Sequence, residues 1–227
     1  MVFLRAAAAV SGNDFQHAIL ALARSSGLPA PLRDEAMTVN LVRVPPEPLP
    51  YRPPSDSSLG LPPEYDAIIE IWGRRSGREI AADMHAALDG TVAALHAYAV
   101  TATQIYHRRP FAQGQPSAGV KLIGRLMFHA DMPDSAARRS WTLHAALAER
   151  VHIGSALYVQ NWVDQPLTDT CPAARGMPIM HFPTEADFLH AFVDSARGMQ
   201  EILQDTAHFV AGGPRFYTTE YVIRPRR

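Results

Sequence analysis

The most constraining feature of the sequence is that its two halves carry the same order of predicted elements. Residues 1–107 and residues 120–227 each predict a strand, a helix, two strands, a helix and a strand, and a linker over 108–119 joins them. Each half is therefore expected to form a ferredoxin-like βαββαβ repeat of the α+β class. Helices cover one face of each sheet, and the other face must also be buried. We expect the two sheets to pack face to face as a pseudo-dimeric barrel within one chain, with two independent domains as the alternative.

The element boundaries follow from apolar residues that alternate in strands and recur three and four apart in helices. The stretch Ser11-Gly12-Asn13-Asp14 offers N-cap residues for a helix, and Gly27 with Pro29 ends that helix. Strands are expected over 2–8, 37–44, 65–72, 97–106, 120–128, 154–163, 177–182 and 216–223, and helices over 15–25, 78–95, 133–151, 185–199 and 204–210. The proline-rich residues 45–63 and residues 164–176 are expected to be loops.

The composition excludes several classes of protein. Of the 227 residues, 47% are hydrophobic, which is enough for a real core, and a net charge of −1 gives no overall field for nucleic acid or anionic membranes. No apolar run reaches the ~18 to 20 residues of a membrane span, and the first residues predict a strand rather than a signal peptide. The single cysteine, Cys171, excludes an intramolecular disulfide and favours a reducing compartment. A cytoplasmic location is therefore expected.

One helix in the second half and the strand after it carry the residues best suited to acid–base chemistry. Trp141 and His144 lie one turn apart on the helix, whereas Tyr158 and Gln160 share one face of the strand and Asn161 lies on the other. A neutral imidazole suits proton transfer near physiological pH, and a tyrosine hydroxyl or an amide can stabilise an enolate-like oxygen. The alternative for each residue is structural: a hydrogen bond between helix and strand, a cross-strand contact or core packing.

Three further residues are weaker candidates for binding a substrate. Arg125, His129 and His181 are either substrate contacts or ordinary surface and strand-end polarity. Glu220 is expected either to pair with Arg125 or to be solvated. No spacing of His, Cys and Asp residues meets a metal template, and no glycine-rich loop precedes a helix in the way that phosphate binding requires. We therefore expect no metal and no cofactor.

Several motifs follow one another in order through the second half. They are Phe128, Trp141, His144-Ala145-Ala146-Leu147, Tyr158-Val159-Gln160-Asn161-Trp162-Val163, Phe182-Pro183-Thr184-Glu185-Ala186-Asp187-Phe188, Leu203-Gln204-Asp205, Phe209-Val210 and Glu220-Tyr221-Val222-Ile223. As a set, over about residues 120–223, they resemble the EthD family of dimeric α/β barrel proteins. That family typically shows a Trp, then His-Ala-Pro-Leu, then Tyr-Val-Gln-Asn, and Ala146 stands here where proline is frequent. The first half is similar in layout but lacks the His-Ala-Pro-Leu motif, so the resemblance implies a tandem chain with one intact and one degenerate site.

The resemblance implies a small cavity for apolar or aromatic molecules. We expect a cofactor-independent lyase, cyclase or isomerase that acts on a small hydrophobic aromatic or polyketide-like carbonyl compound, with His144 as general acid and base. The expected reaction is a dehydration, a decarboxylation or a cyclisation. Tyr158 and Gln160 would orient the substrate oxygen. The alternatives are a monooxygenase of the α/β barrel type, cofactorless or haem-linked, and a non-catalytic binding or assembly protein that docks through residues 45–63. The expected partner is a small hydrophobic substrate, with no nucleic acid or membrane, and the chain is expected to be a monomer or a homodimer.

Overall fold

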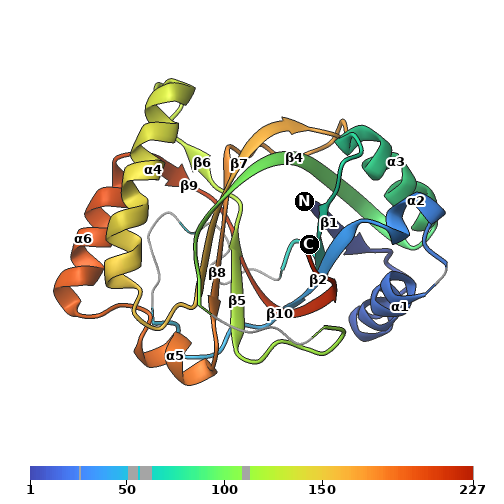
Figure 1. The fold of residues 1–227 in the computed structure, drawn as a ribbon, viewed down its shortest axis with the longest axis horizontal. Coiled ribbons are helices and arrows are strands. Elements are labelled where there is room, and N and C mark those ends of the chain that lie inside the picture. The colour runs from blue at the N-terminus through green and yellow to red at the C-terminus, as the bar shows by residue number, and fades with distance from the viewer. Residues whose placement is uncertain (26, 51–55, 57–62, 109–112, 227) are drawn as a thin grey trace.

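Eight strands of the computed structural model close into one antiparallel barrel (Figure 1). The structure describes residues 1–25, 27–50, 56, 63–108 and 113–226. Around the barrel the strands follow the order β1-β3-β2-β10-β5-β8-β7-β4. They are β1 (Val2–Ala6), β2 (Ala36–Arg43), β3 (Ala67–Trp72), β4 (Val92–His107), β5 (Val120–Gly124), β7 (Leu157–Pro166), β8 (Gly176–Phe182) and β10 (Arg215–Arg224). The expected α+β class is confirmed.

Helices lie on two opposite sides of this barrel (Figure 1). On one side are α1 (Gly12–Arg24), α2 (Ala30–Arg33) and α3 (Gly77–Ala87), and on the other are α4 (Asp134–Val151), α5 (Glu185–His190) and α6 (Ala196–Ala207). Of the predicted capping stretch, Ser11 is the N-cap of α1, because its hydroxyl accepts a hydrogen bond from the backbone N–H of Asp14. Each group of helices buries an apolar cluster against the outer face of the sheet.

A separate apolar core lies inside the barrel. Phe3, Ile68, Ile179 and Phe216 belong to it, and they come from strands around the whole circumference. Strands of the first half meet strands of the second half at two places, where β2 pairs with β10 and β4 pairs with β7. The sheet face that the helices leave uncovered is therefore turned toward the barrel interior.

The barrel interior also contains a buried group of charges. Lys121 of β5 donates to Glu220 of β10 at 2.7 Å and to Glu70 of β3, and both carboxylates are almost fully buried. Burial alone would lower the pKa of Lys121, but the two carboxylates outweigh it and hold that pKa above its usual value. Both expectations for Glu220 are wrong: it is buried rather than solvated, and it binds Lys121, whereas Arg125 pairs with Glu64.

Two expected helices differ from the structure. The helix expected over 78–95 ends at Ala87, Gly90 follows with φ +71°, and β4 begins at Val92. The early part of β4 pairs with β1, so the ladder of hydrogen bonds overrides the helical spacing of the apolar residues. The helix expected over 185–199 is two helices, because the chain leaves the helix after His190 and the Ser195 side chain caps a new one.

The strand expected over 120–128 is interrupted. β5 ends at Gly124, and Met127–Phe128 form β6, which pairs with β9 (Val210–Gly212) in a separate two-stranded sheet. Between them the Arg125 N–H donates to the carbonyl of Pro214, which turns the chain out of the barrel. The strand expected over 154–163 runs on to Pro166. Most of the proline-rich stretch 45–63 lies outside the described residues.

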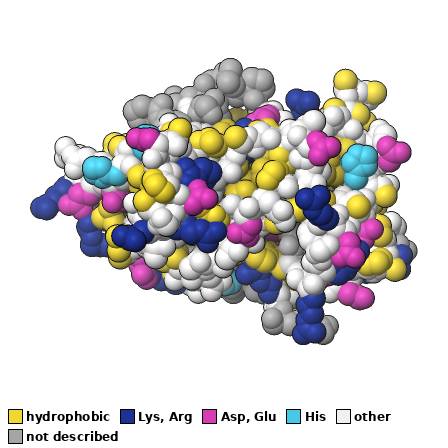
Figure 2. All heavy atoms as spheres, turned by 90° about the horizontal axis from the view of Figure 1, so that it is seen from above, with side chains coloured by type: hydrophobic (Ala, Val, Ile, Leu, Met, Phe, Trp, Pro, Cys, Tyr) yellow, Lys and Arg dark blue, Asp and Glu magenta, His cyan; other side chains and the backbone are white. Residues whose placement is uncertain are grey.

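The surface carries both signs of charge. Figure 2 shows positive and negative side chains interspersed over the face that it presents, with apolar side chains between them. Within the described residues, none of the helices combines the length and the apolar character that crossing a membrane requires.

Candidate active site

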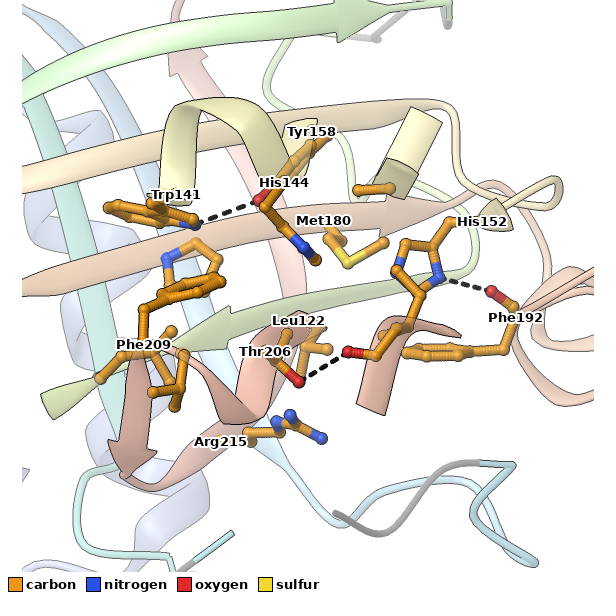
Figure 3. A pocket seen from close by; sticks show the side chains of 16 residues that line it. Leu122, Trp141, His144, His152, Tyr158, Met180, Phe192, Thr206, Phe209 and Arg215 are labelled. Carbon is orange, nitrogen blue, oxygen red and sulfur yellow. Dashed lines mark hydrogen bonds between the residues drawn. The ribbon is translucent and has the colours of Figure 1, made fainter. Parts of the chain in front are cut away.

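A pocket lies between the outer face of the barrel sheet and the helices α4 and α6 (Figure 3). Leu122 and Met180 point to this helix side, whereas their neighbours Ile123 and Ile179 point into the barrel. The cavity has a volume of about 90 Å³. Its lining is mostly apolar and comprises Leu122, Gly124, Leu126, Trp141, His144, Ala148, His152, Tyr158, Pro178, Met180, Phe192, Ile202, Thr206, Phe209, Val210 and Arg215.

Helix α4 supplies one wall of the pocket. Trp141, His144, Ala148 and His152, the C-cap residue, follow at spacings of three, four and four residues, so they share one face. The small side chain of Ala148 leaves space between the two histidines. On β8, a Cβ atom at Gly176 would lie 2.8 Å from the indole of Trp141, so a glycine there lets the indole lie against the sheet.

His144 is paired with a carboxylate. Its Nδ1 lies 2.6 Å from Oδ2 of Asp205, which comes from α6, and no partner for Nε2 is present among the described residues. A carboxylate only accepts hydrogen bonds, so in the neutral imidazole Nδ1 carries the proton and Nε2 presents a lone pair. The His144 side chain is buried, with 8% of its surface exposed. The Asp205 side chain is 39% exposed, so it contacts His144 on one side and solvent on the other.

The Tyr158 hydroxyl is oriented by two donors. Its oxygen accepts hydrogen bonds from Nε1 of Trp141 at 3.2 Å and from Nε2 of Gln160 at 3.0 Å. Burial raises the pKa of Tyr158 well above its usual value, and the two donors only partly oppose that rise, so the hydroxyl is protonated at neutral pH. Because both bonded neighbours donate, the Tyr158 proton is left to donate elsewhere, and the residue lines the pocket. Figure 3 shows Tyr158, Trp141 and His144 close together.

A second histidine lies further along the pocket. His152 Nδ1 is 2.7 Å from the carbonyl oxygen of Phe192, and their rings meet edge to face with centroids 5.0 Å apart. Burial lowers the pKa of His152 to about 4, and the charges of His144 and Arg215 act in the same direction. His152 is therefore neutral at pH 7, with its proton on Nδ1.

The structure brings three of the predicted site residues to the pocket. Trp141, His144 and Tyr158 line it. Gln160 lies behind Tyr158 on the same strand face, and its amide donates to the Tyr158 oxygen and to the backbone carbonyl of Trp141 at 2.6 Å. Asn161 lies on the opposite face of β7, where its amide donates to a backbone carbonyl of β8. Gln160 and Asn161 are not among the residues that line the pocket.

The other three predicted residues are elsewhere. Arg125 forms an ion pair with Glu64, with Nη2 and Oε2 3.0 Å apart. His129 is partly exposed and its Nε2 lies 2.9 Å from a backbone carbonyl at the end of α6. His181 pairs in register with Lys121 across β8 and β5, so both face the barrel interior rather than the pocket.

Sequence reasoning missed Asp205, His152 and Arg215. The spacing of eight residues between His144 and His152 places both on one helix face, which was a usable signal. Asp205 belongs to the motif Leu203-Gln204-Asp205, but its pairing with His144 joins residues 61 apart in sequence. Nothing local in the sequence reveals such a contact. Within the described residues, no three His, Cys, Asp or Glu side chains are grouped as a metal site would need.

Two solved structures share the fold of the chain. One is a candidate monooxygenase from Lactobacillus acidophilus NCFM, which is 9% identical with a TM-score of 0.52 over 98% of this chain and 94% of that one. Another is an anthrone oxidase-like protein, which is 11% identical with a TM-score of 0.53 over 99% of this chain and 90% of that one. At these identities the likeness shows the fold alone, a closed antiparallel barrel with helices on its outer face. No family profile and no curated protein matches the sequence.

Proposed function

We propose that the pocket is the active site of a cofactor-independent enzyme that moves a proton on the carbon beside a carbonyl group. The substrate is a small hydrophobic aromatic or polyketide-like carbonyl compound. The observation that carries this proposal is the joint presence of a histidine fixed by a carboxylate and a tyrosine hydroxyl with a proton to donate, both lining one mostly apolar cavity. A base and an oxyanion stabiliser are the two groups that enolisation requires.

In the proposed reaction the substrate carbonyl oxygen accepts a hydrogen bond from Tyr158. Nε2 of His144 removes the proton from the adjacent carbon, and the negative charge moves to the carbonyl oxygen, where the hydroxyl of Tyr158 stabilises it. The carboxylate of Asp205 stabilises the imidazolium that forms. Return of the proton to a leaving hydroxyl gives dehydration, and return to another carbon gives isomerisation. Attack of the enolate on a second carbonyl gives cyclisation.

The size of the pocket narrows the substrate. A cavity of roughly 150 Å³ holds benzene in a protein interior, and this cavity measures about 90 Å³. A single substituted ring therefore enters only with some side-chain movement. Met180 is well suited to give that room, because an unbranched side chain changes rotamer easily. A single ring is favoured over a multi-ring compound.

A second candidate, a cofactorless monooxygenase, is favoured by the fold neighbours, whose names are those of a monooxygenase and an oxidase-like protein. The monooxygenase reaction would begin with the same removal of a proton by His144, because the resulting carbanion can pass an electron to O2 instead of taking up a proton. The His144 pocket does not fit the haem-linked form, because a haem macrocycle is far larger than its cavity of about 90 Å³.

We further propose that the chain is a tandem, EthD-like protein with repeats over 1–107 and 120–227 and the active site only in the second. The strand order supports this division, since β1–β4 are contiguous around the barrel and β5, β7, β8 and β10 are contiguous too. The His144 pocket lies between elements of the second part.

Turnover of a panel of small aromatic ketones tests the proposal, with product masses and oxygen uptake recorded together. The lyase, cyclase or isomerase form predicts product without oxygen uptake, whereas the oxygenase form predicts one O2 consumed per turnover. His144→Ala is expected to abolish either activity while the melting temperature changes by a few degrees. Full activity of His144→Ala on a confirmed substrate would refute the assigned role.

A further inference from the structure

The pocket has a hydrogen-bonding group at each end of its helical wall. His144 and His152 are eight residues apart on α4, which corresponds to roughly 12 Å along the helix axis. Ala148 lies between them and leaves room over the middle of that span. Tyr158 is beside His144, with ring centroids 6.5 Å apart. The His144 end thus offers a hydroxyl donor and a base, and the other end is formed by His152.

His152 can only accept a hydrogen bond from a bound molecule. Its Nδ1 proton is used by the Phe192 carbonyl at 2.7 Å, because a carbonyl oxygen cannot donate. Its Nε2 therefore carries a lone pair, and Figure 3 shows this nitrogen turned away from Phe192 and toward the pocket. No partner for His152 Nε2 is present among the described residues. His152 is 5% exposed, and its Nε2 is not among the fully buried atoms that lack a partner, so this nitrogen is open to the pocket. A ligand that covers it must bring a donor, because an acceptor buried by the ligand without a partner is costly.

We infer that His152 Nε2 accepts a hydrogen bond from a hydroxyl group of the substrate, so that the pocket selects a hydroxylated aromatic ketone over the same ketone without the hydroxyl. The inference rests on the proposed function only for the carbonyl end, where Tyr158 donates. The length of such a ligand matches the length of the pocket. A para-substituted ring with a hydrogen bond of about 2.8 Å at each end covers a length comparable to the spacing of His144 and His152 along α4.

Binding of two matched probes tests this inference without requiring turnover. The probes are 4-hydroxyacetophenone and acetophenone, titrated by calorimetry into the full chain. The wild type is expected to bind the hydroxylated ketone about tenfold more tightly, because only it satisfies the acceptor. In His152→Asn, whose amide keeps the bond to the Phe192 carbonyl but removes the acceptor at the Nε2 position, the two affinities are expected to agree within twofold.

Three outcomes would overturn the inference: equal affinities in the wild type, the same preference in a folded His152→Asn variant, or no binding of either ketone to the wild type. 4-Methoxyacetophenone is the matched control, since it has the same oxygen without the proton and is expected to bind no better than acetophenone. His144→Ala separates the proposed function from the proposed hydrogen bond to His152. The variant is expected to lose enzymatic activity and still to bind 4-hydroxyacetophenone more tightly than acetophenone. Either proposal can therefore be refuted while the other stands.

A measurement on the wild type covers the case in which His152→Asn does not fold. Nitrogen-15 NMR of the histidine side chains distinguishes protonated from unprotonated ring nitrogens. Saturation with 4-hydroxyacetophenone is expected to shift the unprotonated Nε2 signal of His152, whereas saturation with acetophenone leaves it in place. An unchanged Nε2 signal under saturating 4-hydroxyacetophenone would contradict the inference.

Discussion

At the scale of single residues, the partner of each side chain decides what it can do. His144 and His152 lie on one face of one helix, yet His144 has a carboxylate partner and His152 has a backbone carbonyl. The sequence could predict that Trp141 and His144 share a face and that Tyr158 and Gln160 do, because helix and strand periodicities determine both. It could not predict Asp205 or the Phe192 carbonyl, since those partners come from other elements.

Replacing Tyr158 with Phe tests the hydroxyl donor. We expect kcat to fall about 100-fold, the cost of losing one oxyanion-stabilising donor, with a smaller change in KM. The fold should weaken by about 1–3 kcal/mol, because the Trp141 and Gln160 N–H groups lose their acceptor. Steady-state kinetics on a confirmed substrate, with a thermal melt of each sample, checks both. Undiminished kcat would show that the hydroxyl has no part in the reaction.

The lowered pKa of His152 predicts how stability depends on pH. The value is about 4 in the folded chain, against 6.5 for an unperturbed histidine. Below pH 6.5 His152 binds a proton in the unfolded chain but stays neutral in the folded chain. The contribution of neutral His152 to the free energy of unfolding is therefore complete above pH 6.5 and is lost as the pH falls toward 4. The contribution is about 3 kcal/mol. Urea unfolding between pH 7 and 4 should show this loss in the wild type and not in His152→Asn; parallel curves for the two proteins would contradict it.

At the scale of elements, periodicity identified the type of most helices and strands but not where each ends. The apolar spacing of residues 78–95 is helical, yet Val92 and the residues after it pair with β1, because sheet pairing is a tertiary contact that no local pattern shows. The same holds at Gly124, where β5 stops and the chain turns toward β6. The hydroxyl of Ser195 starts a new helix inside an apparently continuous one.

Lys121 joins three strands through its two carboxylate partners, so Lys121→Met should be strongly destabilising. It leaves Glu70 and Glu220 buried without their cation, and we expect a loss of about 3–5 kcal/mol in the free energy of unfolding. The matched control is the triple variant Glu70→Gln, Lys121→Met, Glu220→Gln, which removes all three charges and should recover most of that loss. Denaturant unfolding measures each. A Lys121→Met variant as stable as the wild type would mean that the charges do not hold the strands together.

At the scale of the whole molecule, the order of elements in the sequence is enough to predict the α+β class, and the likeness to two solved structures agrees with a barrel fold. The physical reason for closure is that helices cover only the outer face of the sheet, so its other face must be buried. What the sequence left open was the position of the pocket. The pocket with His144 is on the Leu122 face of β5, which contacts the helices, and a second hollow of about 220 Å³ lies on the opposite face, where Lys121, Glu70 and Glu220 line it.

The closed barrel predicts that the chain is a monomer. Each of its eight strands pairs with a neighbour on both sides, so the barrel offers no free strand edge to a second copy. Native mass spectrometry should give 24.9 kDa at micromolar concentration. A stable species of twice that mass would show that another surface forms a dimer.

Proton transfer by His144 within this pocket is tested most directly by deuterium exchange into the methyl group of 4-hydroxyacetophenone in D2O, followed by proton NMR. We expect the wild type to accelerate exchange about 100-fold over buffer, the contribution of a positioned general base. With a folded His144→Ala variant, the ketone should exchange at the buffer rate. Exchange at the buffer rate with the wild type, or equal acceleration by both proteins, would show that His144 is not the base.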